Sequence, residues 1–168
     1  EDVPVLLAFS KLFVPPADDW GPNVFQTGPW NLPPMVGFQP SQALEQFLAN
    51  GPKPVYLGFG TKDMTDFDEE FELFTSAARG AGQRLLMRPG KGGGEEGLLA
   101  EDVYLVRSTP HTWLFPQSAA VVSHGGPGTV AAALRAAVPQ AIVPHDFDNN
   151  YYGQRANDLG VAPPPLAR

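Results

Sequence analysis

The alternation of short apolar segments with amphipathic ones after Pro54 constrains the fold more than any other feature of this sequence. The apolar segments suit buried strands and occupy residues 55–60, 84–87, 103–106, 119–122 and 141–144. Between the first two, Phe67, Phe71, Phe74 and Ala78 recur at helical spacing on one face. Strands alternating with helices are typical of parallel βαβ construction. We therefore predict an α/β fold with a Rossmann-like parallel sheet flanked by helices.

The N-terminal part of the chain has a different character. It opens at Glu1, directly before an apolar, strand-like run at residues 3–9, and prolines then recur from residue 14 to 54. Each proline fixes its own φ and removes a backbone donor, which excludes most regular structure. A short helix capped by Ser41 is the exception. We expect residues 1–40 to be the end of a preceding domain with an interdomain linker, and residues 41–168 to form a second domain.

The composition excludes several classes of function. Eleven Lys and Arg against eighteen Asp and Glu give a net charge of -7, so we expect no nucleic-acid partner. The absence of cysteine excludes disulfides, thiol catalysis and thiolate metal sites. The sequence contains neither an apolar run long enough to span a membrane nor the layout of a signal peptide. We therefore expect a soluble, cytoplasmic protein.

The strongest functional signal is the segment from His124 to Thr129, where glycines stand at 125, 126 and 128 and a buried strand passes into a helix. Backbone N–H groups of the first helical turn and the positive end of the helix dipole would face an anion there. His124 and Thr129 add side-chain donors. On pattern alone, the less favoured alternative is that the glycines only serve tight packing. The P-loop lysine and the G-x-G-x-x-G spacing are both absent, which disfavours ATP hydrolysis and NAD chemistry.

Three other segments follow predicted strands and so fall at the same edge of the sheet, where open parallel sheets bind ligands. Gly60 and Thr61 follow the first strand, the polar residues 108–111 follow the third, and residues 145–150 follow the last. In the last segment, carboxylates and amides suit sugar hydroxyls, although Asp148 could instead cap the following helix. Trp113 is expected in the core. The histidines and aspartates lack the spacing of a metal site, so we expect none.

Four motifs in this order resemble a known family. They are Pro-Val-Tyr-Leu-Gly-Phe-Gly-Thr at 54–61, Pro-His-Thr-Trp-Leu-Phe-Pro at 110–116, His-Gly-Gly-Pro-Gly-Thr at 124–129 and Gly-Val-Ala-Pro-Pro-Pro at 160–165. Together they resemble nucleotide-sugar-dependent glycosyltransferases of GT-B fold, in the branch of sterol 3-beta-glucosyltransferases and bacterial macrolide and glycopeptide glycosyltransferases. Residues 25–30 look like the linker between the two halves of such enzymes.

The resemblance implies that the chain is the C-terminal half of a GT-B fold, which binds a UDP- or TDP-sugar and needs no cofactor or metal. It implies an inverting displacement at the anomeric carbon, in which this half stabilises the departing diphosphate. Carried over by motif, the donor-binding residues lie near the phosphates (Gly60, Thr61), around the base (Ser108, Thr109, His111), on the diphosphate (His124, Gly126, Gly128, Thr129) and on the sugar (Asp148, Asn149).

Part of such an enzyme lies outside this sequence. The family's general base is a histidine near the start of the N-terminal acceptor domain, so we expect no catalytic residue here. The helices that usually follow Pro165 are also absent, which makes the second domain truncated. A hydrophobic small-molecule or lipid acceptor would bind through the N-terminal domain, which allows for peripheral membrane contact.

Three departures from the family pattern affect the donor site. Asp148 and Asn149 stand where Asp-Gln is usual, and Ser108 stands where an apolar or aromatic residue is common. Residues 87–91, Met-Arg-Pro-Gly-Lys, replace a loop that usually contains Gly-Trp. Two alternative functions stay open at this point: a nucleotide-sugar epimerase or hydrolase that uses Asp146 and Asp148, and a non-catalytic nucleotide- or carbohydrate-binding module.

Overall fold

The computed structural model describes residues 3–31, 37–60, 67–90 and 93–166, in two compact units that we treat separately. The first unit ends at Val36 and the second begins at Gly37. Thr61, one of the predicted site residues, lies outside the described residues. Within the described part of the chain, no helix has the length and apolar character needed to cross a membrane.

The first unit contains two short parallel strands, β1 (Val5–Leu7) and β2 (Val24–Gln26). A hydrogen bond joins the long connection between them to β2: the Gln26 Nε2 donates to the Val14 carbonyl over 2.7 Å. The apolar run at the N-terminus predicted β1. The strand β2 lies in the proline-rich segment and was not predicted.

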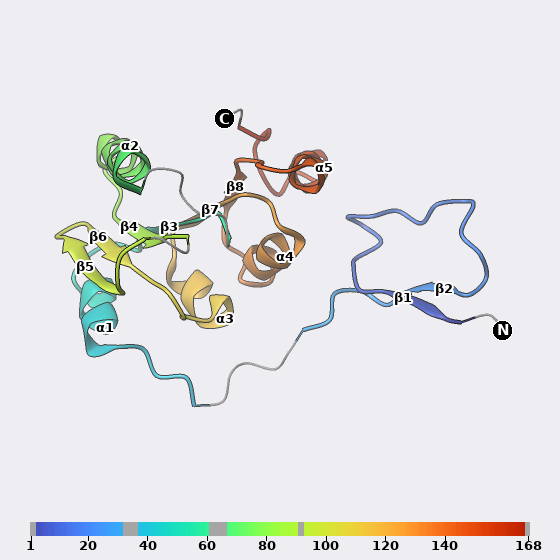
Figure 1. Ribbon diagram of the computed structural model, residues 1–168, viewed down its shortest axis with the longest axis horizontal. Coiled ribbons are helices and arrows are strands. Elements are labelled where there is room, and N and C mark those ends of the chain that lie inside the picture. Colours follow the sequence, from blue (N-terminus) through green and yellow to red (C-terminus); the bar gives the residue numbers. More distant parts are fainter. Residues whose placement is uncertain (1–2, 32–36, 61–66, 91–92, 167–168) are drawn as a thin grey trace. The chain divides into compact units, whose positions relative to one another are not determined.

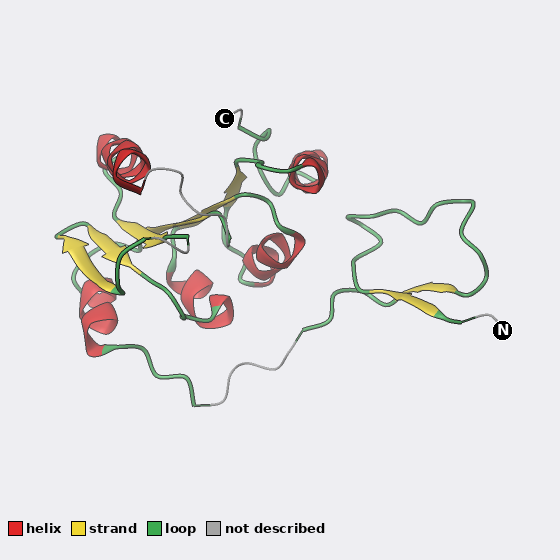
Figure 2. Ribbon diagram, viewed as in Figure 1, coloured by secondary structure: helices red, strands yellow, loops and turns green. Residues whose placement is uncertain are grey.

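The second unit is a six-stranded sheet with helices on both faces (Figures 1 and 2). Its strands are β3 (Val55–Gly58), β4 (Leu85–Arg88), β5 (Gly97–Ala100), β6 (Val103–Leu105), β7 (Ala120–Ser123) and β8 (Gln140–Ile142). Its helices are α1 (Gln42–Ala49), α2 (Phe67–Gly80), α3 (His111–Leu114) with the 3-10 turn η1 (Phe115–Gln117), α4 (Pro127–Arg135) and α5 (Phe147–Asp158). The spatial order is β5-β6-β4-β3-β7-β8, and all neighbours are parallel except the edge strand β5.

The core lies in two layers, one on each face of the sheet. On the face covered by α1, α3 and α4, Tyr56, Leu86 and Val121 pack against the helices. On the face covered by α2, Leu57 and Met87 do the same. Strands buried on both faces are apolar at nearly every position, which explains why the sequence shows continuous apolar runs there.

The strand order places a ligand crevice at a defined point. The chain starts at the central β3, moves outward through β4 to β6, and then returns to build β7 and β8 on the other side. In open parallel sheets, ligands bind at such a reversal, outside the carboxyl ends of the strands on either side of it; we call this edge at β3 and β7 the crevice. In register, Gly58 of β3 stands between Arg88 of β4 and Ser123 of β7. This row forms the floor of the crevice.

The predicted fold class is confirmed, with local differences. The edge strand β5 is absent from the prediction, because glycine-rich residues 89–97 mask the short apolar run that follows them. The last helix is capped by Asp146, so the alternative role of Asp148 as its N-cap is wrong. Ser41 caps α1 as predicted, its hydroxyl accepting from the Leu44 N–H over 3.2 Å.

A glycine substitution tests how tightly the β7–α4 connection is packed. Gly125 has φ +89°, and a Cβ there would lie 2.7 Å from Ile142 Cγ2 and 3.1 Å from the Asn149 carbonyl oxygen. Gly125→Ala should therefore lower the free energy of unfolding by about 2 kcal/mol or more. In Gly80→Ala the new Cβ meets nothing within 4 Å, so stability should be unchanged or slightly higher. Urea midpoints of the two variants give the comparison; equal midpoints would contradict this packing.

Candidate functional site

The connection from β7 to α4 forms the centre of the candidate site. The N-cap of α4 is Gly126, which has no side chain to bond the first turn, and Pro127 follows at the first helical position. The N–H groups of Thr129 and Val130 both turn back to the Gly126 carbonyl at 3.0 Å. Pro127 has no N–H and those of Thr129 and Val130 bond within the turn, so the start of α4 presents the Gly128 N–H and the positive end of the helix dipole, both of which suit an anion.

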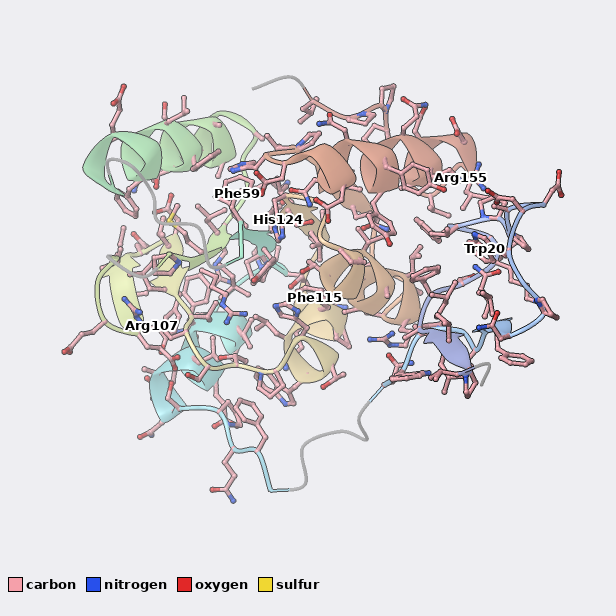
Figure 3. All side chains as sticks on the ribbon, turned by 45° about the vertical axis from the view of Figure 1, so that its right-hand side comes forward. Trp20, Phe59, Arg107, Phe115, His124 and Arg155 are labelled. Atoms are coloured by element: carbon pink, nitrogen blue, oxygen red, sulfur yellow. The ribbon has the colours of Figure 1, made fainter. Side chains whose placement is uncertain are left out.

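The imidazole of His124 fills the space between two strand ends (Figure 3). A Cβ on Gly60 would lie 2.9 Å from its Cε1, and a Cβ on Gly126 would lie 2.5 Å from its Nε2. Gly60 also has φ +78°, a conformation that favours glycine. The half-buried ring thus occupies space that a side chain on either glycine would take. The structure brings together three of the predicted site residues here: Gly60, His124 and Gly126.

The three glycines of the turn have different reasons to be glycine. Gly125 is required by backbone conformation and by the neighbouring Ile142, and Gly126 by the His124 ring. Gly128 is exposed, has an ordinary φ, and its Cβ would meet nothing within 4 Å. Because Cα–Cβ bonds in a helix tilt toward its N-terminus, that Cβ would project into the space before α4. Packing explains two of the glycines and leaves Gly128 without a structural reason.

The segment that follows β6 carries the predicted base-binding residues. Ser108 is exposed, Thr109 is buried, and His111 opens α3. The His111 ring stacks on Phe115 at 4.4 Å between centroids, with 14° between the planes. Its Nε2 lies 3.3 Å from the Tyr56 hydroxyl and 3.4 Å from Arg88 Nη1. His111 is therefore part of a small polar cluster that sequence reasoning missed.

This cluster holds His111 in its neutral form. Burial, with a further contribution from the positive charge of Arg88, lowers the pKa of His111 to about 4. Burial likewise raises the pKa of Tyr56, and Arg88 partly offsets that rise. At neutral pH the only charge in the cluster is the Arg88 guanidinium. Arg88 directly follows a predicted strand, and this charged residue was the one signal in the sequence that could have identified the cluster.

The predicted sugar-contacting pair lies at the start of α5. Asn149 is buried, with 4% of its surface exposed. Its Oδ1 accepts from the Asp146 N–H, and its Nδ2 donates to Asp148 Oδ1, both over 3.2 Å. The amide therefore orients the carboxylate of Asp148, which is exposed. Before the helix, the His145 ring stacks on Phe59 at the end of β3, with centroids 4.7 Å apart.

The described part of the protein also has a cavity of about 440 Å³ at the opposite edge of the sheet, where the strands begin. Asn50, Arg79, Arg84, Glu101 and Asp102 line it. Arg79 donates twice to the Asp102 carboxylate, over 2.7 and 2.9 Å, and Arg84 stacks on the Phe47 ring. Both arginines of this cavity are therefore engaged within the protein. The cavity is separate from the carboxyl edge of the sheet, which holds the predicted site residues.

Comparison with known proteins relates the chain to glycosyltransferases. Residues 87–165 match the C-terminal domain of the erythromycin biosynthesis protein CIII-like family. The chain is 37% identical to sterol 3-beta-glucosyltransferase UGT80A2 of Arabidopsis thaliana and 43% identical to O-mycaminosyltylonolide 6-deoxyallosyltransferase of Streptomyces fradiae. Each alignment includes 98% of this chain but only 26% and 39%, respectively, of the relative.

Solved structures show the same fold. The chain superposes on the kitacinnamycin glycosyltransferase with a TM-score of 0.71 and 23% identity, over 95% of this chain and 41% of that one. It superposes on the calicheamicin glycosyltransferase CalG4 with a TM-score of 0.70 and 23% identity, over 98% and 39%. These likenesses identify the second unit as the C-terminal half of a GT-B fold, as the motifs predicted.

The neutral His111 makes stability depend on pH in a defined window. Its pKa is about 4 in the folded protein and about 6.5 in the unfolded chain. Between these values the unfolded state binds more protons, so stability is full above pH 6.5 and falls as the pH drops toward 4, by up to about 1.4 kcal/mol per pH unit. In His111→Asn this slope should be smaller. Urea denaturation at pH 7.0, 6.0 and 5.0 measures it; parallel pH profiles for the two proteins would contradict a depressed pKa.

Proposed function

This chain is homologous to the C-terminal domain of sterol and macrolide glycosyltransferases, and from that premise we propose that its second unit binds a UDP- or TDP-sugar donor. The chain spans between a quarter and two-fifths of the two relatives named above. The activity of a whole enzyme is accordingly part of the proposal: inverting transfer of a hexose to a hydroxyl of a lipid-like or natural-product acceptor. The names of the sterol and macrolide enzymes support that acceptor class.

The observation that carries the proposal is Gly128. It lies in the first turn of α4, where the fold itself does not require glycine, and the space that its Cβ would enter is open. A diphosphate placed there would meet the Gly128 N–H and the positive end of the α4 dipole. Gly60 and Gly126 allow His124 to stand beside the same position as a side-chain donor.

The chemistry that these groups supply is stabilisation of a leaving group. In the transfer, the acceptor oxygen forms a bond to the anomeric carbon while the bond from that carbon to the diphosphate oxygen breaks. Negative charge develops on the diphosphate, and preorganised N–H and O–H donors from α4, His124 and Thr129 would stabilise it. We propose that no metal ion is needed, because these donors act directly. We propose no residue of this chain as the general base that deprotonates the acceptor hydroxyl.

The remaining predicted residues would bind the base and the sugar, the two ends of the donor. Residues 108–111 would face the base from the end of β6, and the exposed carboxylate of Asp148 would accept hydrogen bonds from sugar hydroxyls. Asn149 would hold Asp148 in place, because its own amide is engaged by Asp146 and Asp148. Asp146 caps α5, which weakens the alternative in which Asp146 and Asp148 act as an acid and base pair.

Titration calorimetry with UDP and TDP tests the donor site directly. Gly128→Ala should fold with the stability of the wild type or slightly better, yet bind the nucleotide at least about 10-fold more weakly, because its methyl group occupies the phosphate position. His124→Ala removes a side-chain donor and should weaken binding by about 10-fold or more. Gly80→Ala is the matched control and should bind normally.

Two outcomes would contradict the proposal. One is a folded wild-type protein, judged by circular dichroism, that binds neither UDP nor TDP at millimolar concentration. The other is nucleotide binding that Gly128→Ala leaves unchanged. Metal dependence is read from the same titrations with and without EDTA, and equal affinities are expected.

A further inference from the structure

The donor site as proposed leaves one of the three departures from the family pattern unused. In that departure, at residues 87–91, Arg88 is the last residue of β4 and lies on the face of the sheet that carries α3 and α4. A half-buried cation at the carboxyl end of a central strand needs a physical reason, because partial desolvation disfavours a charge that has no counter-charge.

The contacts of Arg88 are with neutral groups. Its Nη1 lies 3.4 Å from His111 Nε2, and its guanidinium interacts with the Tyr56 hydroxyl. Ion pairs among the described residues join Arg79 to Asp102 and Arg155 to Asp158, and none of them reaches Arg88. Among the described residues, the positive charge of Arg88 therefore has no counter-charge.

The same contacts place this charge near the β7–α4 turn. The Tyr56 hydroxyl lies over Gly58, only 2.5 Å from where a Cβ of that glycine would stand. Gly58 is paired in register with Ser123, the residue before His124. Adjacent strands are about 4.8 Å apart, so a group held at the Tyr56 hydroxyl lies roughly one strand spacing from the β7–α4 turn. The space that a side chain of Gly58 would fill is occupied by this hydroxyl.

We propose that Arg88 binds the nucleoside-proximal phosphate of the donor, while the start of α4 binds the other phosphate. This inference rests on the proposed function, in which residues 108–111 face the base. Because Arg88 contacts His111, it lies on the base side of the diphosphate. Tyr56 and His111 are positioning residues: they hold the guanidinium by neutral contacts and leave its charge for the ligand. Arg is suited to this role, since its planar donors match phosphate oxygens.

The test separates phosphate recognition from base recognition by comparing uridine with UMP, and thymidine with TMP, in NMR titrations of the full chain. Arg88→Met should weaken UMP or TMP binding about 10- to 100-fold, the range for a hydrogen bond to a charged group, and leave nucleoside binding unchanged. Arg88→Lys keeps the charge and should recover a clear preference for the monophosphate. Arg79→Met changes the net charge equally at the opposite edge and should have no effect.

The outcomes distinguish this inference from the proposed function. If the wild type binds no uridine or thymidine nucleotide, the proposed function itself fails. If the wild type binds and Arg88→Met leaves UMP or TMP affinity unchanged, only the role of Arg88 is overturned. Equal losses for nucleoside and monophosphate would also overturn it, because they indicate a structural effect on the base-binding segment. So would a lysine variant that prefers the monophosphate no more than the methionine variant does.

Discussion

The central position of β3 between β4 and β7 is the constraint on which the rest of the second unit depends. Parallel register across these three strands brings Arg88, Gly58 and Ser123 into one row at the carboxyl edge of the sheet. The chain reverses its direction of strand addition between β3 and β7, so this row is also the place where helices leave the sheet in opposite directions. The position of the crevice follows from topology, before any side chain is considered.

Glycines at this edge then determine which side chains can lie there. The Tyr56 hydroxyl occupies the space over Gly58, and the His124 ring occupies the space between Gly60 and Gly126. In each case a methyl group in place of the glycine hydrogen would overlap a polar side-chain group. The glycines of the edge therefore do more than shape turns: they admit a tyrosine hydroxyl and an imidazole into positions that ordinary side chains would fill.

The sequence predicted the parts of this arrangement that depend on local patterns. Continuous apolar runs located the five parallel strands, because a strand covered on both faces has no polar position. Glycines between a strand and a helix located the turn. Contacts between distant segments escaped prediction: nothing local joins Tyr56, Arg88 and His111, which come from three separate elements and meet only in the folded sheet. The burial of Asn149 was also missed, because its capping role requires the exact start of α5.

A net charge of -7 would appear to disfavour an anionic ligand, and the site accounts for this apparent conflict. Solvent ions screen exposed charges beyond roughly 10 Å, so the acidic surface acts weakly at the crevice. Within the crevice, the described groups nearest the proposed diphosphate are backbone N–H groups, imidazoles and one guanidinium. His111 stays neutral partly because Arg88 is charged. The proposed binding of a diphosphate therefore depends on these few oriented groups rather than on the charge of the whole chain, and Asp148 adds a carboxylate at the sugar end of the same edge.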